Sequence, residues 1–159
     1  MVEVGEKIPK VSLVDTELKQ VNLQEAASGA PIVVAFFPGA FTGICTKEMC
    51  TFRDSLAELG GIGGRLYAVS VDGPFSNKEF KEKNRLGFTV LSDYAREAVR
   101  AFGVEMKDFA HLKGYTAAKR SVFIADKNGV IRFKWVTEDP TVEPNYAAVK
   151  KALAEARGK

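Results

Sequence analysis

Cysteine and histidine are both scarce in this sequence, which contains only Cys45, Cys50 and His111. A structural zinc site normally takes four cysteine or histidine ligands, so a metal centre of that kind is nearly excluded. A disulfide between two cysteines five residues apart would close a short loop and remove little entropy from the unfolded chain. The pair is therefore a poor structural staple, which leaves redox chemistry, nucleophilic chemistry or plain burial.

Long apolar runs and blocks of like charge are also missing. No stretch approaches the ~20 apolar residues that a membrane span needs, and Met1 to Lys10 contains no apolar signal core. We therefore expect a cytoplasmic protein that does not cross a membrane. The net charge is +3, from 23 basic and 20 acidic residues, without a run of five like charges. This charge pattern gives no indication of nucleic-acid binding.

The residues that are present fit one compact α/β domain over residues 1–159. Hydrophobic residues make up 46% of the chain and charged residues 27%, which is typical of a globular protein. Alternating polarity predicts an N-terminal hairpin over Val11–Leu23. Further strands are predicted by apolar runs and by an Asn128-Gly129 hairpin signal, at Pro31–Phe37, Arg65–Val71, Phe88–Leu91 and within Ser121–Val136.

Helix signals lie between and after these strands. Helical spacing begins at Thr42, and the glycine cluster at 60–64 ends that helix. Three more helices are predicted, beginning at Ser76 in capping-box form, at Ser92-Asp93 with an end at Gly103, and at Pro144 with an end near Ala156. The order of elements predicts a mixed central sheet flanked by helices, a plan that resembles the thioredoxin fold.

The segment from Phe36 to Cys50, FFPGAFTGICTKEMC, is the part of the chain best suited to chemistry. A buried strand ends in a Pro-Gly turn, and Cys45 falls in the first turn of the following helix. Free N–H groups and the positive end of the helix dipole stabilise a thiolate there. Thr42 lies three residues earlier, so its hydroxyl can reach the sulfur or a bound oxygen. The competing interpretation is that Cys45 is a small buried hydrophobe.

Cys50 needs a separate argument. On an ideal helix its Cα atom lies roughly 8–9 Å from that of Cys45, beyond the ~7 Å limit for a disulfide. The pair can bond only if the first turns of the helix unwind. Packing in the core beside Met49 and Phe52 is the alternative role for Cys50. It weakens if Cys45 is reactive, because a neighbouring thiol commonly removes a sulfenic acid.

Pro38, Thr42 and Cys45 match the pattern P-x-x-x-T-x-x-C, and this motif in its strand-turn-helix context resembles the peroxiredoxin family. Cys50, five residues after Cys45, resembles the bacterioferritin-comigratory or Q-type subgroup, in which both thiols lie on one helix. The stretch from Pro38 to Thr42 also resembles the subgroup of peroxiredoxin 5. The likeness covers nearly the whole chain.

The resemblance assigns roles to further residues. It implies that an arginine on a later strand lies beside the reactive cysteine, and Arg120 matches it; from the sequence alone a solvated strand-end arginine is the better interpretation. It implies a substrate-binding role for Pro38 and for Glu48, which would steady Arg120, although an exposed helix carboxylate is equally consistent. His111 is predicted to be structural or on the surface, because no Cys–His triad pattern surrounds it.

The implied function is a thiol peroxidase that reduces hydrogen peroxide and organic hydroperoxides. In that scheme Cys45 becomes a sulfenic acid, Cys50 forms a disulfide with it, and a thioredoxin-like or glutaredoxin-like protein reduces the bond. No metal, flavin or nicotinamide is implied. The alternatives are a peroxidase that uses Cys45 and an external thiol, a thiol-disulfide oxidoreductase, and a redox-switch protein. The sequence leaves both a monomer and a homodimer open.

Overall fold

A computed structural model describes residues 1–58 and 65–157, apart from the side chains of 56–58. The chain order of the elements follows the predicted alternation, with additions. They are β1 (Ser12–Val14), β2 (Gln20–Asn22), α1 (Leu23–Ala26), β3 (Ile32–Phe36), α2 (Gly43–Glu58), β4 (Leu66–Ser70), α3 (Pro74–Lys83), β5 (Thr89–Ser92), α4 (Glu97–Phe102), β6 (Glu105–Met106), β7 (Ala117–Ala118), β8 (Ser121–Ala125), β9 (Ile131–Val136) and α5 (Tyr146–Arg157).

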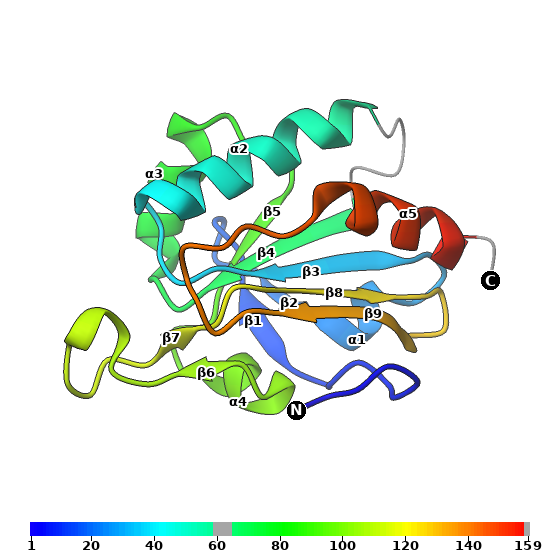
Figure 1. The fold of residues 1–159 in the computed structure, drawn as a ribbon, viewed down its shortest axis with the longest axis horizontal. Helices are drawn as coiled ribbons and strands as arrows, with labels where there is room; N and C mark the ends of the chain where they lie inside the picture. The colour runs from blue at the N-terminus through cyan, green and yellow to red at the C-terminus, as the bar shows by residue number, and fades with distance from the viewer. Residues whose placement is uncertain (59–64, 158–159) are drawn as a thin grey trace.

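Within the described residues, seven strands form one sheet in the order β2-β1-β5-β4-β3-β8-β9 (Figure 1). Strands β3, β4 and β5 run parallel, whereas β8 is antiparallel to β3 and β1 is antiparallel to β5. The predicted mixed sheet is therefore confirmed. All five residues of β3 are buried, as its continuous apolar sequence predicts for a strand covered on both faces.

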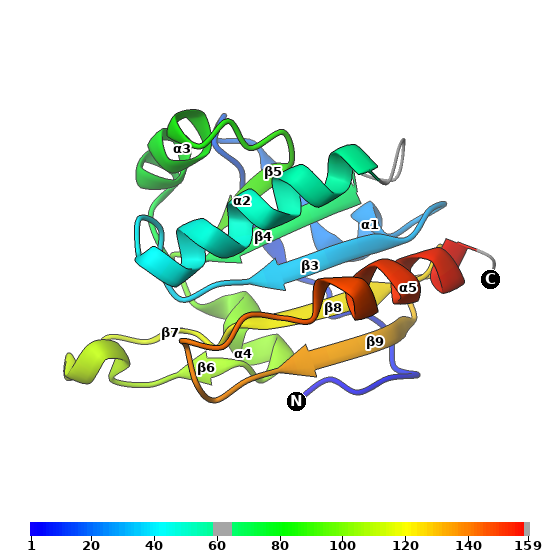
Figure 2. The same cartoon turned by 45° about the horizontal axis from the view of Figure 1, so that its top comes forward.

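Helices cover both faces of the sheet. Side chains along β3 alternate in direction, so they pack against both helical layers. Val33 and Ala35 pack into one apolar cluster, with side chains of α2, α3 and α5. Val34 and Phe36 pack into the other, with side chains of α1 and α4. Figure 2 shows α2 and α5 lying side by side along one face, with α4 on the opposite face. Helix α2 follows β3 in the chain, so it begins at one end of this sheet.

Both predicted hairpins are present. In the N-terminal one, β1 pairs with β2 around a turn in which Asp15 Oδ1 accepts hydrogen bonds from the N–H groups of Glu17 and Lys19. In the second, β8 pairs with β9, and Gly129 in the turn has a φ of 77°, in the left-handed region that glycine tolerates. The two hairpins form the two edges of the sheet. Its parallel strands lie at the centre, and α2 follows one of them, β3.

The predicted starts of three helices need correction. Helix α3 begins at Pro74 and not at Ser76, because Gly73 caps it and proline suits the first helical position. Helix α5 begins at Tyr146 and not at Pro144, since Asn145 Oδ1 accepts the N–H of Ala148. Helix α4 begins at Glu97. The predicted cap Asp93 nevertheless serves it by accepting the N–H groups of Ala98 and Val99, and the predicted end at Gly103 is confirmed.

One prediction, the end of the helix that begins near Thr42, lies outside the described residues. The helix predicted from Thr42 is present as α2, and the glycine cluster at 60–64 lies in the undescribed stretch.

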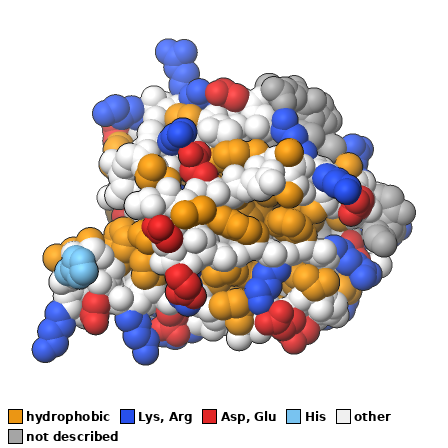
Figure 3. All heavy atoms as spheres, viewed as in Figure 1, with side chains coloured by type: hydrophobic (Ala, Val, Ile, Leu, Met, Phe, Trp, Pro, Cys, Tyr) orange, Lys and Arg blue, Asp and Glu red, His pale blue; other side chains and the backbone are white. Residues whose placement is uncertain are grey.

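Strands β6 and β7, which the sequence did not predict, form a short antiparallel arm beside the main sheet. The arm carries a 3₁₀ turn at Phe109–His111, and His111 is exposed on it (Figure 3).

Residues 1–58 and 65–157 contain no helix long and apolar enough to cross a membrane. The same residues hold no group of three or more histidine, cysteine, aspartate or glutamate side chains placed to bind a metal ion. Over the face in Figure 3, charged side chains of both signs are scattered around a central band of apolar ones.

Candidate active site

The start of α2 is built by the turn that follows β3. Ala40 N–H donates to Asp72 Oδ2 at 2.7 Å, and Phe41 adopts a φ of 66°, which reverses the chain. The first helical hydrogen bond then runs from Thr46 N–H to Thr42 O at 2.9 Å. Cys45 precedes that donor and is only 1% exposed. Its sulfur is therefore held at a helix start, where backbone N–H groups lack helical partners.

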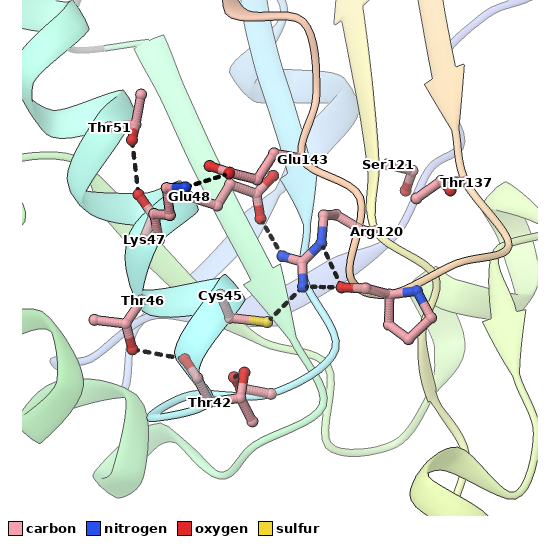
Figure 4. A network of polar contacts seen from close by, with 12 residues as sticks. Thr42, Cys45, Thr46, Lys47, Glu48, Thr51, Arg120, Ser121, Thr137 and Glu143 are labelled. Atoms are coloured by element: carbon pink, nitrogen blue, oxygen red, sulfur yellow. Dashed lines mark hydrogen bonds and ion pairs between the residues drawn. The ribbon is translucent and has the colours of Figure 1, made fainter.

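Arg120 is brought to this sulfur by the register of the sheet. Ser121, the first residue of β8, pairs with Phe36, the last residue of β3, so Arg120 lies beside the turn that leads into α2. Its Nη2 donates to Cys45 Sγ at 3.2 Å (Figure 4). The guanidinium is a permanent cation, so it stabilises negative charge on the sulfur or on an oxygen next to it.

Three further hydrogen bonds fix the Arg120 guanidinium in place. Nη1 donates to Glu48 Oε1 at 2.7 Å, and both Nε and Nη2 donate to Pro140 O, at 3.2 and 2.7 Å. Arg120 is only 1% exposed, so the interpretation as a solvated strand-end arginine is wrong. Because its donors are already oriented, little reorganisation is needed when charge develops beside them.

Glu48 lies behind Arg120 and not on the wall of the pocket described below. It is fully buried, so the exposed-carboxylate interpretation is wrong, and it holds the guanidinium at Nη1, next to the Nη2 that reaches Cys45 (Figure 4). Burial raises the pKa of Glu48 to about 7, against the opposing effect of Arg120. Its Oε2 has no hydrogen-bond partner among the described residues. Glu48 thus contacts the Arg120 guanidinium, as the resemblance implies, and does not line the pocket.

A second carboxylate, Glu143, lies next to this pair and had no sequence signal. It accepts a hydrogen bond from Tyr146 Oη at 2.7 Å and forms an ion pair with Lys47 Nζ at 3.1 Å. Partial burial opposes ionisation of Glu143, but these two partners lower its pKa overall. Burial and the bond to Glu143 raise the pKa of Tyr146. The negative charge of Glu143 also raises the pKa of Glu48, which couples the two carboxylates.

A pocket of about 160 Å³ opens at Cys45. Four of the predicted site residues line it, namely Pro38, Thr42, Cys45 and Arg120. The rest of the wall had not been predicted and consists of Gly43, Ile44, Phe109, Pro140 and Thr141. Thr42 Oγ1 donates to Gly39 O at 2.8 Å, so its lone pairs remain available to a group in the pocket. The sulfur, a cation and a hydroxyl thus face one cavity with a partly apolar wall.

Cys50 is half-buried on α2 and does not face this pocket. Both cysteines are free thiols, and α2 is continuous from Gly43 to Glu58. Five residues of helix separate the two Cα atoms by roughly 8–9 Å, so they cannot bond in this conformation. Cys50 Sγ instead lies 3.7 Å from Asn84 Oδ1, at the end of α3. The structure is therefore that of the reduced, fully helical form.

Comparison with known proteins agrees with this geometry. A family model described as the AhpC/TSA family matches residues 4–134, which is well over half of the chain. The chain belongs to the AhpC/TSA family. The predicted resemblance to peroxiredoxins is confirmed, because the relatives found in this family carry that name.

Individual relatives of this AhpC/TSA family chain support the same assignment. Peroxiredoxin Q of the chloroplast of Oryza sativa subsp. japonica is 36% identical over 132 residues, which are 83% of this chain and 58% of that protein. This chain therefore spans less than two thirds of that relative's length. A peroxiredoxin-like protein from Aquifex aeolicus superposes with a TM-score of 0.84 at 30% identity, over 98% of this chain and 88% of that one. The peroxidoxin BcpB of Mycobacterium tuberculosis gives 0.81 at 27% identity, over 99% and 98%. The predicted thioredoxin-like fold is thus confirmed.

The raised pKa of Glu48 predicts a pH-dependent stability that Glu48→Gln should remove. Between pH 4.5 and about 7 the folded protein binds a proton that the unfolded chain has released. The associated stability is present below pH 4.5 and is lost as the pH rises through about 7. Relative to the Gln variant, the protein should therefore lose on the order of 3 kcal/mol of unfolding free energy across this range.

Urea unfolding from pH 4.5 to 8 measures the difference, with both proteins carrying Cys45→Ser so that Glu48 is the group that differs beside Arg120. A difference in unfolding free energy that stays constant over this range would show that Glu48 is ionised throughout.

Proposed function

We propose that this chain is a thiol-dependent peroxidase in which Cys45 attacks a peroxide. The observation that carries the proposal is the 3.2 Å contact between Arg120 Nη2 and Cys45 Sγ, on the wall of a pocket at a helix start. A cation beside a buried sulfur favours the thiolate, which is the nucleophilic form. The same cation is placed to stabilise charge on the oxygen that leaves when the O–O bond breaks.

The first chemical step oxidises the sulfur. The Cys45 thiolate attacks the terminal oxygen of a hydroperoxide, so that an S–O bond forms and the O–O bond breaks. The peroxide gains the electron pair as an alkoxide, or as hydroxide from hydrogen peroxide. This leaving group takes up a proton and departs as an alcohol or water, and Cys45 is left as a sulfenic acid. Arg120 donates to the departing oxygen, and Thr42 accepts from the peroxide O–H.

Both hydrogen peroxide and organic hydroperoxides fit this pocket. Its volume of about 160 Å³ is roughly ten times the ~10–15 Å³ that a water-sized molecule needs. Apolar side chains of Ile44, Phe109 and Pro140 line it beside the polar groups, so an alkyl chain can be accommodated. Pro38 is buried beneath the turn and shields the sulfur from water.

The second step forms a disulfide within the chain. The Cys50 thiolate attacks the sulfenic sulfur of Cys45, an S–S bond forms, the S–O bond breaks, and hydroxide leaves as water with the proton from Cys50. The geometry of α2 requires its first turns to unwind before this attack. A dithiol protein of the thioredoxin or glutaredoxin type then exchanges with the disulfide and restores both thiols.

Mass spectrometry after one equivalent of peroxide, combined with steady-state turnover, tests this scheme. We expect an intramolecular Cys45–Cys50 bond and continued peroxide consumption with thioredoxin as reductant. A Cys45 sulfenic acid that only a small external thiol reduces would instead indicate a one-cysteine peroxidase. Reduction of insulin without peroxide turnover would indicate an oxidoreductase, and a single equivalent consumed would indicate a redox switch.

Hydrogen exchange on the two redox states tests the unwinding of α2. In the reduced protein, amides of the continuous helix should be protected from Thr46 onward, because Thr46 N–H donates its first helical hydrogen bond. In the disulfide form the first two turns should be broken, and amides from Gly43 to Phe52 should exchange faster. A protein that contains the bond but shows unchanged exchange across this stretch would contradict the helical placement of the pair.

A further inference from the structure

Asn84 contacts the Cys50 thiol from the end of α3. Cys50 Sγ lies 3.7 Å from Asn84 Oδ1. The other end of the amide is already engaged, because Asn84 Nδ2 donates to Phe80 O at 2.9 Å. That bond orients the amide so that its oxygen, an acceptor with no proton of its own, faces the sulfur. The partner that matches an amide oxygen is the S–H of a protonated thiol.

Asn84 also holds α2 one turn further along. Arg53 Nη1 donates to the backbone oxygen of Asn84 at 2.7 Å. One residue of α3's end thus contacts two positions on the same helix, Cys50 through its side chain and Arg53 through its main chain. A substitution of the Asn84 side chain deletes only the first contact and leaves the second.

The contact with Cys50 matters because it must break before a disulfide can form. Cys50 has to leave α3 and approach Cys45 across the roughly 8–9 Å that an intact helix imposes. It must also lose its proton, since the thiolate is the attacking species. The Asn84 oxygen opposes both changes, because it holds the sulfur in place and accepts a bond that only the protonated form can donate.

We propose that Asn84 is a positioning residue for Cys50 that slows disulfide formation by holding the thiol against α3. The inference rests on the proposed function, in which Cys50 resolves the Cys45 sulfenic acid. Two reactions then compete for that acid. Cys50 converts it to a disulfide with release of water, whereas a second hydroperoxide oxidises it to a sulfinic acid and is itself reduced to an alcohol or water. By slowing the first reaction, Asn84 makes Cys45 more susceptible to the second.

The test measures how much peroxide is needed to over-oxidise half of Cys45 in one turnover. The measurement is intact mass after reduced protein is mixed with increasing cumene hydroperoxide. Asn84→Ala removes the amide oxygen, and a weak hydrogen bond accounts for a roughly two- to fivefold change. We expect the half-point to rise by that factor, with an unchanged second-order rate of the first peroxide attack. An unchanged or lower half-point overturns the proposal.

Two matched variants show whether the effect passes through Cys50. Asn84→Asp keeps an oxygen that accepts the S–H and adds a charge that disfavours the thiolate, so its half-point should fall below that of the unmodified protein. In the Cys50→Ser background, Asn84→Ala should leave the half-point unchanged, and any rise there would overturn the proposal by placing the effect on Cys45. If the unmodified protein forms no Cys45–Cys50 disulfide, the second step of the proposed function fails. That result is distinguishable from a disulfide that forms with a half-point unaffected by Asn84→Ala.

Discussion

Cys45→Ser should abolish peroxide consumption while the protein stays folded. The serine hydroxyl is close in size to the thiol and can still accept the bond from Arg120 Nη2, so the packing around the pocket should persist. The hydroxyl is not ionised at neutral pH and is a poor nucleophile without a base to take its proton. Loss of a sole nucleophile lowers turnover on the order of 10⁴-fold or more.

Cys50→Ser is the matched control for this experiment. It places the same substitution on the same helix at a half-buried position outside the pocket. The first equivalent of peroxide should still react quickly, turnover with thioredoxin should then stall, and Cys45 should become over-oxidised. Thermal unfolding and circular dichroism establish that both variants are folded. Appreciable peroxide turnover by folded Cys45→Ser would exclude Cys45 as the nucleophile.

The parts of the fold that the sequence predicted correctly are those whose signals are local. The apolar run of β3 and the Asn128-Gly129 turn depend on neighbouring residues alone, and both are present as predicted. The start of α3 was misplaced because a capping-box pattern at Ser76 competes with Gly73-Pro74. Burial decides between them. Asn77 lies inside the helix and accepts a hydrogen bond from the hydroxyl of Ser70 on the adjacent strand β4, a contact that no local pattern specifies.

The residues of the candidate site also divide into those with a local sequence signal and those without one. Pro38, Thr42 and Cys45 lie within eight residues, so a local motif was sufficient to place them together. Arg120 is 75 residues from Cys45, and only the family resemblance singled it out. Pro140 contributes its backbone carbonyl. Every residue type has this group, so the sequence could not reveal the role of Pro140.

Glu48 was identified from the sequence, and the resemblance implied that it steadies Arg120, but its burial was not predicted. An acidic residue three positions after Cys45 looks solvated until the tertiary structure buries it behind Arg120. Asn84 had no signal, because its contact with Cys50 depends on how α2 and α3 pack. The chemistry of the nucleophile was therefore readable from the sequence, whereas the groups that tune it come from long-range packing.

Arg120→Ala should slow the attack of Cys45 on peroxide by about 10²- to 10³-fold, the usual cost of removing one oriented donor from a reacting oxyanion. The substitution removes the donor to Cys45 Sγ and leaves Glu48 buried without its cation. Arg120→Lys should recover only part of the rate. A single ammonium cannot reproduce the planar fork that reaches Cys45, Glu48 and Pro140 together.

Stopped-flow measurement of the peroxide-dependent phase gives the rate, and iodoacetamide alkylation of Cys45 in the Cys50→Ser background reports its nucleophilicity separately. Lys119→Ala is the matched control, because it removes the neighbouring cation, whose partner is the exposed Glu138. Both rates should remain unchanged in that control. Both should fall in Arg120→Ala, since the guanidinium supports the thiolate before peroxide arrives, and peroxide attack should fall further because the leaving oxygen also loses its donor. If the two rates fall by the same factor, Arg120 serves the resting sulfur alone and has no part in stabilising the leaving oxygen.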